Sequence, residues 1–274
     1  MSNIKTVVVP IDFSDTSANA LSFAAELSKR TSARLLAVHI LQNSDTKEEI
    51  KNKLQSVESG LKTSFGSGLK CESSLAHGDI VTALKKIIEA EQADLVIMGT
   101  KGASGLKKIL IGSNTLKVIA KIKMPVLVIP EVAQFENFLN KGKSRIVLAT
   151  DLISLENEDA LNILKEIALL IIEPKVRVLS VRPKNTSLPH LKRAERNFLL
   201  SLFNPEIESE SITVFSSNVI SGINFYLNKK EDTGLVAMIA RDSAQLIQKH
   251  YTREMASHTH LPLLVLHDVF NFIS

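Results

Sequence analysis

The chain has 274 residues, of which 45% are hydrophobic and 23% charged, enough for one or two packed soluble domains. The net charge of +4 is small, tryptophan is absent and no segment interleaves aromatic with basic residues, so a dedicated nucleic-acid-binding protein is disfavoured. No apolar run approaches the roughly 18 residues that span a bilayer, and a signal-peptide core is missing. The single cysteine, Cys71, permits no internal disulfide. We therefore expect a cytoplasmic protein without a membrane partner.

In the first half, short apolar strands alternate with stretches of helical periodicity. Strands are predicted over 6–10, 34–40, 70–75, 95–99 and 126–129, and helices over 15–30, 47–64, 79–91 and 113–122. Apolar residues at helical spacing, such as Ile50, Leu54 and Leu61, support the helices. Strands made mostly of Val, Ile and Leu are typical of a parallel sheet buried on both faces. The pattern predicts a doubly wound α/β domain, in which a ligand binds at the carboxyl ends of the strands.

The second half repeats the first. An apolar strand beginning at Arg145 leads to Asp151 and a serine, as the first strand leads to Asp12 and a serine. Both halves close on a proline, Pro125 or Pro262, followed by an apolar strand. Two copies of one domain explain this self-similarity. We place the domains at residues 1–135 and 144–274, with a linker over 131–144.

The segment from Gly99 to Ser113, GTKGASGLKKILIGS, lies between a predicted strand and a predicted helix. Glycines such as Gly102 and Gly112 let backbone N–H groups approach an anion that a side chain would block. The helix that follows adds unpaired amides and the positive end of its dipole. Residues 95–130 contain no Asp or Glu but six lysines, Lys101, Lys107, Lys108, Lys117, Lys121 and Lys123. A solvated helix face would explain the lysines alone, but the whole combination predicts a phosphate cradle for a nucleotide.

Four features together carry a resemblance to a known family. They are the start Pro10-Ile-Asp-Phe-Ser, a second strand that ends His39-Ile40, the spaced glycines after Met98, and the closing strand Pro-Val-Leu-Val-Ile-Pro from Pro125. The first half resembles a universal stress protein, and the whole chain resembles a tandem member with two such domains. The resemblance implies two doubly wound α/β domains of the adenine-nucleotide alpha hydrolase-like type, each with a five-stranded, mainly parallel sheet flanked by helices.

The resemblance also implies a site and a function. In ATP-binding members, backbone amides and hydroxyls of the glycine loop hold the phosphates, the end of the fourth strand lies beneath the ribose, and main-chain groups at the end of the second strand meet the adenine. An aspartate after the first strand lies close to the ribose, the phosphates and a bridging Mg²⁺. The implied nucleotide-binding residues are Pro10, Asp12, Ile40, Met98, Gly99, Gly102, Gly112, Ser113, Asn114 and Thr115. Asp12 is the candidate metal ligand, no catalytic residue is implied, and the ligand is ATP, ADP or AMP.

Residue-level reasoning leaves alternatives open at two of these positions. Asp12, with Ser14, could instead cap the helix that follows the first strand, and Ser113 could cap its own helix. His39 lies in an apolar strand and is expected to be a core residue. The spacing of His250, His258 and His260 suits no familiar zinc site. Cys71 has no His-Asp pair near it in the sequence, which favours a buried thiol over a nucleophile.

The second half departs from the glycine pattern. When its strand 235–240 is aligned with strand 95–99, Ala240, Ser243 and Lys249 replace the glycines, and the loop is shorter. Side chains there would occupy the phosphate path, so we predict that only the first domain holds a nucleotide.

The sequence favours an ATP-binding stress-response or regulatory module with at most slow ATP hydrolysis, because no second acid or histidine near Asp12 in the sequence would orient water. Two alternatives remain. One is an ATP-consuming enzyme of the same α/β group, although its expected Ser-Gly-Gly-type loop is absent. The other is an interaction scaffold that binds no nucleotide. Pairing through the last strands predicts an intramolecular pseudo-dimer or a further homodimer, and the protein partner stays unknown.

Overall fold

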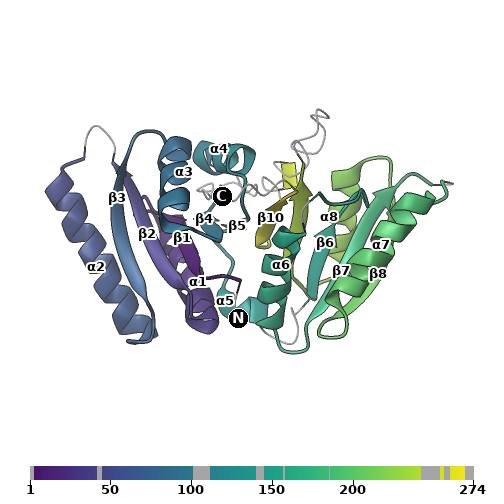
Figure 1. Ribbon diagram of the computed structural model, residues 1–274, viewed down its shortest axis with the longest axis horizontal. Helices are drawn as coiled ribbons and strands as arrows, with labels where there is room; N and C mark the ends of the chain where they lie inside the picture. Colours follow the sequence, from purple (N-terminus) through teal and green to yellow (C-terminus); the bar gives the residue numbers. More distant parts are fainter. Residues whose placement is uncertain are drawn as a thin grey trace. The chain divides into compact units, whose positions relative to one another are not determined.

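The computed structural model describes residues 3–41, 45–100, 112–139, 145–156, 158–184, 186–241, 254–255 and 260–268. The chain divides into two compact units, unit 1 over Met1–Gln134 and unit 2 over Phe135–Phe270. Each unit is a parallel sheet flanked by helices (Figure 1). Among the described residues, none of the helices combines the length and the apolar character needed to cross a membrane.

Unit 1 alternates strands and helices along the chain. Its described elements are β1 (Thr6–Pro10), α1 (Asp15–Thr31), β2 (Arg34–Leu41), α2 (Lys47–Phe65), β3 (Cys71–His77), α3 (Ile80–Glu91), β4 (Leu95–Gly99), α4 (Ser113–Lys121) and β5 (Val126–Ile129). The strand order is β3-β2-β1-β4-β5, and neighbouring strands are parallel. The chain begins with the central strand β1, adds β2 and β3 on one side, and then adds β4 and β5 on the other side. The direction in which strands are added therefore reverses between β1 and β4. This reversal is the switch point at which doubly wound sheets bind ligands.

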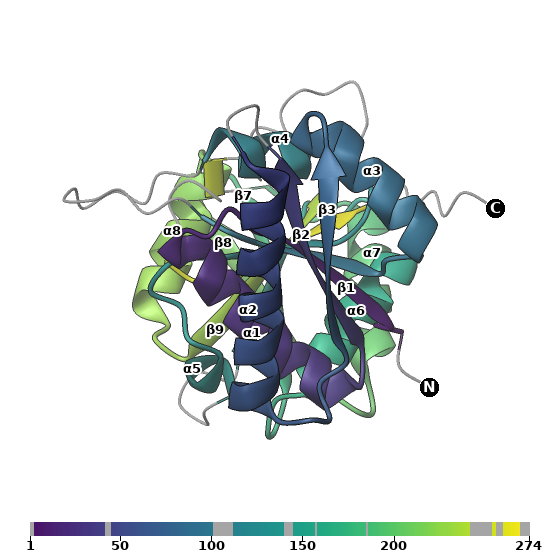
Figure 2. The same ribbon diagram turned by 90° about the vertical axis from the view of Figure 1, so that its left-hand side faces the viewer.

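Helices cover both faces of the sheet in unit 1. α1 packs beside α2, and α3 packs beside α4 (Figure 2). Because both faces are covered, the central strand β1 is buried along its length, and Val7, Val8 and Val9 have no exposed surface. The edge strand β3 has the sequence CESSLAH and is only partly buried. The Ser14 hydroxyl accepts a hydrogen bond from the Ser17 N–H and starts α1.

Unit 2 has the same topology. After the short helix α5 (Phe135–Leu139), its described elements are β6 (Arg145–Ala149), α6 (Asp159–Leu169), β7 (Lys175–Arg182), α7 (His190–Phe203), β8 (Glu208–Phe215), α8 (Val219–Lys229), β9 (Thr233–Ala240) and β10 (Leu263–His267). The strand order is β10-β9-β6-β7-β8, again with parallel neighbours. The predicted fold class, doubly wound α/β with five-stranded parallel sheets, is confirmed.

A short helix lies where the sequence suggested only linker. α5 (Phe135–Leu139) falls inside the expected linker 131–144 and contacts β9 of unit 2. The side chains of Phe135 and Phe138 are buried, with their ring centroids 5.9 Å apart. Unit 2 therefore begins at Phe135, earlier than the expected start at residue 144, because two buried aromatic rings attach this segment to its core.

Candidate functional site

The strands of unit 1 bring the predicted site residues to one edge of the sheet. β1 pairs with β4, with Val7 opposite Leu95 and Val8 opposite Val96. β1 also pairs with β2 along its whole length. Because all three strands are parallel, their carboxyl ends lie at the same edge. Pro10, Asp12, Ile40, Met98 and Gly99 therefore come from three adjacent strand ends, as the sequence predicted.

Asp12 takes part in the turn that starts α1. Its Oδ1 accepts hydrogen bonds from the Ser14 N–H at 3.0 Å and from the Ser14 hydroxyl at 2.5 Å. Between them, Phe13 has a φ of 61°, in the left-handed region. Partial burial raises the pKa of Asp12, but the hydrogen bonds from the Ser14 side chain and backbone outweigh burial and lower the pKa overall. Asp12 is thus ionised at neutral pH. It also accepts hydrogen bonds from Ser14, the N-cap of α1, and so supports the start of that helix.

Gly99 is required by packing. A Cβ on Gly99 would lie 2.4 Å from the Thr16 carbonyl oxygen and 2.8 Å from the Thr16 carbonyl carbon. The end of β4 thus passes directly against the first turn of α1. The buried Thr115 hydroxyl donates a hydrogen bond to the Gly99 carbonyl oxygen at 3.0 Å and ties α4 to the same strand end. Both residues have structural roles that the glycine pattern alone did not reveal.

The first turn of α4 is open to an anion. Gly112 is the N-cap with φ −62° and ψ 145°, no side-chain cap of the helix is seen within the described residues, and its first turn contains no acidic residue. Ser113 and Asn114 are exposed at the first two helical positions. The N-cap is therefore Gly112, and the alternative in which Ser113 caps its own helix is wrong. An uncapped helix start leaves backbone N–H groups available for an anionic ligand.

Part of the predicted cradle lies outside the described residues. Gly102, Lys101, Lys107 and Lys108 fall in 101–111, which the structure does not describe. The side chains of Ile40 and Met98 are 9% and 5% exposed, so ligand contacts by these residues would use the main chain. Within the described part of the chain, no group of three or more His, Cys, Asp or Glu residues could hold a metal ion.

A buried histidine links the turns after β1 and β2. Its ring nitrogens face two oxygens: Nδ1 of His39 lies 2.9 Å from the Ile11 carbonyl oxygen, and Nε2 lies 3.2 Å from Oδ2 of Asp45. The Phe13 ring covers the imidazole at a centroid distance of 4.8 Å. His39 is a core residue, as expected, but sequence reasoning missed its two partners. The sequence feature that could have indicated one of them is Asp45, an acidic residue a few positions after the second strand.

Unit 2 fills the corresponding edge with charged groups. Its Leu152 follows Asp151 with a φ of 57°, matching the turn at Phe13 in unit 1. Arg241 directly follows β9 and is 6% exposed. Its guanidinium donates to the carbonyl oxygens of Ile153 and Ser154 at 2.5 and 3.0 Å and pairs with Asp268. Its Nε also lies 3.7 Å from Oδ1 of Asp151.

The acceptors of Arg241 are themselves held in place. The Glu156 N–H donates to Oδ1 of Asp268 at 2.8 Å, which ties the end of β10 to the turn after β6. Ala240 ends β9 as Gly99 ends β4, and the following residues 242–250 lie outside the described residues. A buried ion pair therefore stands at the strand edge of unit 2, where unit 1 has Gly99 and an uncharged Thr100.

The fold and this edge define the class of protein: a doubly wound α/β domain with a glycine N-cap on the helix after β4 and an aspartate after β1. Residues 3–130 match the model of the Universal stress protein family. Universal stress protein MJ0531 of Methanocaldococcus jannaschii is 30% identical over 141 residues, which cover 46% of this chain and 81% of that protein. Universal stress protein MJ0577 of the same organism is 27% identical over 155 residues, covering 46% of this chain and 94% of that protein.

A solved structure extends the likeness in fold to both units. The crystal structure of a universal stress protein from Archaeoglobus fulgidus aligns with 97% of this chain and 100% of its own, with a TM-score of 0.74 and 18% sequence identity. The match to the family model falls in the first half, and the match in fold spans both halves. The chain belongs to the universal stress protein family.

Proposed function

We propose that unit 1 binds an adenine nucleotide at the carboxyl ends of β1, β2 and β4, and that the protein is a regulatory or stress-response module. The observation that carries this proposal is the start of α4. Within the described residues, it has a glycine N-cap, no side-chain cap and no acid in its first turn, and the Thr115–Gly99 hydrogen bond ties it to the end of β4. Backbone N–H groups and the helix dipole at such a start favour phosphate.

Each proposed contact follows from this placement. The N–H groups of Gly112, Ser113, Asn114 and Thr115 would hold phosphate oxygens, with Gly102 from the loop outside the described residues. The ends of β4 and β2 would contact the ribose and the adenine through the main chain, because the side chains of Met98 and Ile40 are buried. Such contacts recognise the phosphates and the purine through main-chain groups, so ATP, ADP and AMP all fit.

A magnesium ion carried by the nucleotide fits Asp12. The carboxylate is exposed at the strand end, and both hydrogen bonds from Ser14 go to Oδ1. Within the described residues, Oδ2 is left for a hard cation, which prefers carboxylate oxygens. The lowered pKa keeps Asp12 ionised at neutral pH. The ion would supply neutralisation of phosphate charge.

We propose binding with at most slow hydrolysis. His39 lies in β2 at this edge, but both of its nitrogens face protein oxygens and the Phe13 ring covers it. It is therefore badly placed to accept a proton from water, a step that efficient hydrolysis needs.

We further propose that unit 2 is a second, degenerate copy that binds no nucleotide in this mode. The buried Arg241–Asp268 pair at its strand edge supports this, because a polyphosphate arriving there would have to displace it. One nucleotide per chain is expected.

Calorimetric titration of nucleotide-stripped full-length protein with Mg-ATP tests the proposal. Gly112→Val is the site variant, because its φ of −62° and ψ of 145° suit valine while the added side chain blocks the helix start. Gly68→Val is the matched control, since nothing lies within 4 Å of a Cβ there. We expect one site per chain in the wild type and the control, and none in Gly112→Val.

Two results would contradict this reading. No binding by folded wild-type protein would favour the interaction scaffold, and rapid turnover of the bound ATP would favour an ATP-consuming enzyme. For the regulatory role, we expect nucleotide to slow hydrogen exchange of the α4 amides. If hydrogen exchange of the α4 amides is unchanged at a saturating nucleotide concentration, binding does not alter this surface and the proposed regulatory role is contradicted.

A further inference from the structure

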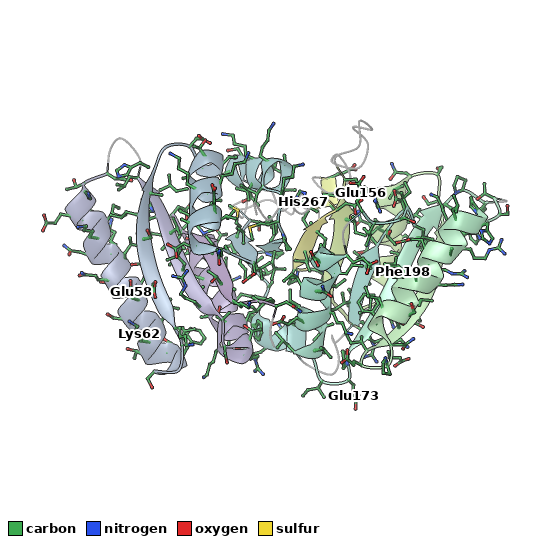
Figure 3. All side chains as sticks on the ribbon, viewed as in Figure 1. Glu58, Lys62, Glu156, Glu173, Phe198 and His267 are labelled. Atoms are coloured by element: carbon green, nitrogen blue, oxygen red, sulfur yellow. The ribbon has the colours of Figure 1, made fainter. Side chains whose placement is uncertain are left out.

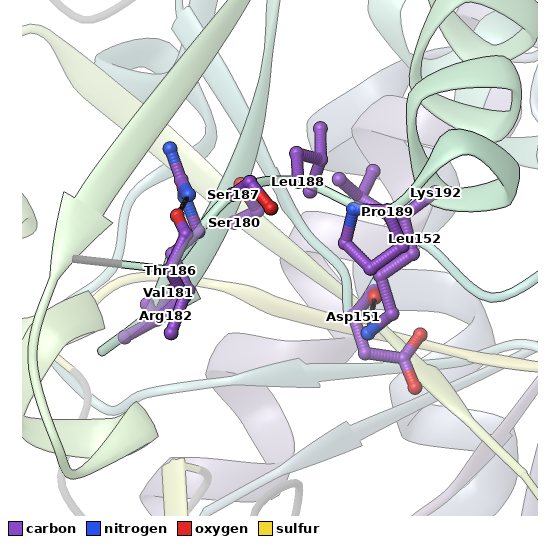
Figure 4. A pocket seen from close by; sticks show the side chains of 10 residues that line it. All are labelled: Asp151, Leu152, Ser180, Val181, Arg182, Thr186, Ser187, Leu188, Pro189 and Lys192. Atoms are coloured by element: carbon purple, nitrogen blue, oxygen red, sulfur yellow. Dashed lines mark hydrogen bonds between the residues drawn. The ribbon is translucent and has the colours of Figure 1, made fainter. Parts of the chain in front are cut away.

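Unit 2 contains a pocket at the carboxyl ends of β6 and β7 (Figure 4). Its volume is about 250 Å³. The walls come from the turn after β6, the last residues of β7, the segment between β7 and α7, and the first turn of α7. Since a water molecule takes about 30 Å³, a ligand here would displace on the order of eight waters, which suits a small ring compound. The pocket lies at the end of the sheet where doubly wound folds bind ligands.

A serine side chain lines the pocket. Ser180, near the end of β7, is 6% exposed and is one of the lining residues. The Ser180 hydroxyl can donate to an acceptor in the pocket and accept from a donor.

Lys192 supplies a positive charge on the opposite wall. Its Nζ donates one hydrogen bond, at 2.8 Å, to the carbonyl oxygen of Asp151 (Figure 4). That bond fixes the ammonium group at the pocket and leaves two of its three donors for a ligand. The Asp151 carboxylate, which also lines the pocket, accepts from the Ile153 N–H at 3.2 Å and lies 3.7 Å from Nε of Arg241. Arg241 thus offsets the one negative charge in the wall.

The surrounding segment is strongly cationic. Residues 182–196 contain Arg182, Lys184, Lys192, Arg193 and Arg196, but only one acid, Glu195, which is buried. Arg182 lines the pocket and is held in place: it donates to the Thr186 carbonyl oxygen, and its guanidinium carbon lies 4.9 Å from the centroid of the Phe215 ring. A local excess of positive charge attracts anions.

The remaining walls are mainly apolar. They include Leu152, Val181, Leu188 and Pro189. Small-molecule sites combine such walls with a few polar groups that fix the orientation of the ligand. We propose that this pocket binds a small carboxylic acid with a compact ring body: the ring against the apolar walls, and the carboxylate on Lys192 and the Ser180 hydroxyl. This site is distinct from the nucleotide site proposed in unit 1.

The test uses the full-length protein and a matched pair of probes, 2-naphthoate and its uncharged analogue 2-naphthamide, titrated by ligand-observed NMR. We expect naphthoate to bind about tenfold more tightly than the amide, because only the acid offers an anionic acceptor to the Lys192 ammonium. Lys192→Met keeps the length of the side chain and removes its charge, so the preference for the acid should disappear. Lys184→Met is the control, an exposed lysine of the same segment that does not line the pocket, and it should bind as the wild type does.

A second variant covers the case in which Lys192→Met unfolds. Ser180→Ala removes only a hydroxyl and should weaken naphthoate binding several-fold and amide binding by less, because a hydrogen bond to a charged acceptor is the stronger one. Equal binding of acid and amide by the wild type would overturn the proposal and leave only adventitious apolar binding. Naphthoate that is displaced by Mg-ATP, or lost in Gly112→Val, would also overturn it, because the acid would then occupy unit 1. Naphthoate binding that survives in Gly112→Val and resists Mg-ATP supports a separate site, even if the wild type binds no nucleotide.

Discussion

The carbonyl oxygen of Thr16 lies so close to Gly99 that a methyl group on Gly99 would be only 2.4 Å from it. This oxygen belongs to the backbone of the first turn of α1, so it cannot move without moving the helix. The contact makes glycine obligatory at the end of β4, whether or not a ligand is bound. One glycine of the motif is therefore explained by packing.

Gly99→Ala should lower the free energy of unfolding by about 1–3 kcal/mol, the usual cost of overpacking. Urea unfolding measures it. Gly60→Ala is the matched control, because Gly60 lies inside α2 with nothing within 4 Å of a Cβ. That substitution should instead stabilise by about 0.5–1 kcal/mol through helix propensity. Equal effects of the two variants would contradict the close contact.

His39→Phe should also destabilise the protein. The Ile11 carbonyl oxygen and the Asp45 carboxylate each lose a hydrogen bond to the buried ring. An unpaired buried polar group costs about 1–3 kcal/mol, which thermal or urea unfolding would register. A variant as stable as the wild type would contradict this expectation and would mean that water satisfies both oxygens in place of the imidazole.

The acid dependence of stability should reflect Asp232. Hydrogen bonds from Arg177, at 2.7 and 2.8 Å, lower the pKa of Asp232 below its unfolded value of 3.8, against the opposing effect of burial. The folded state thus prefers the ionised carboxylate. Its contribution is complete well above pH 3.8 and is lost as the pH falls through the lower, folded-state pKa.

Asp232→Asn should therefore lower the free energy of unfolding at neutral pH by about 1–2 kcal/mol, allowing for the partial exposure of Asp232. The difference between variant and wild type should shrink as the pH falls below 3.8. Urea unfolding at several pH values tests both points, and a difference that grows at low pH would contradict the assignment.

Cys71 should be unreactive in the folded protein. Burial raises the pKa of its thiol to about 11, with a further increase from Glu58 that exceeds the opposing effect of Lys62 (Figure 3). The reactive thiolate is therefore scarce near pH 8. A chromogenic disulfide reagent should label the native protein slowly and the denatured protein quickly. Fast labelling of the native state would show that β3 opens readily.

Arg241→Met should be the most destabilising of these changes. It leaves Asp268 buried without its cation, since Asp268 is 4% exposed. Breaking a buried pair from one side costs about 3–5 kcal/mol. If the single variant fails to fold, Arg241→Met with Asp268→Leu removes both charges and should recover much of the loss. No recovery in the double variant would argue against a pairwise interaction.

Most of the fold follows from local patterns in the sequence. The bounds of β1, β4 and β5 agree with the prediction, because short runs of Val, Ile and Leu between helical stretches are unambiguous. α5 was missed because five residues are too few to display helical periodicity, and only the burial of two phenylalanines holds it. The Gly99–Thr16 contact was also invisible, since it joins backbone atoms of different elements.

The site in unit 2 was even harder to foresee. Arg241 looks like an ordinary solvated residue after a strand, and its acceptors Ser154 and Asp268 lie 87 and 27 positions away in the sequence. Ser180 looks like a routine polar residue in a strand. Their roles depend on tertiary placement, which a pattern of single residues does not encode.

The Arg241–Asp268 pair sets a limit on any redesign of this protein. Transplanting the glycine loop of unit 1 into unit 2 would leave a guanidinium in the path of the incoming phosphates, held by two carbonyl oxygens and a carboxylate. Residues 241 and 268 would have to be replaced together, before the loop. A second site of the kind proposed for unit 1 would therefore require remodelling of a buried charge pair, and not only the introduction of glycines.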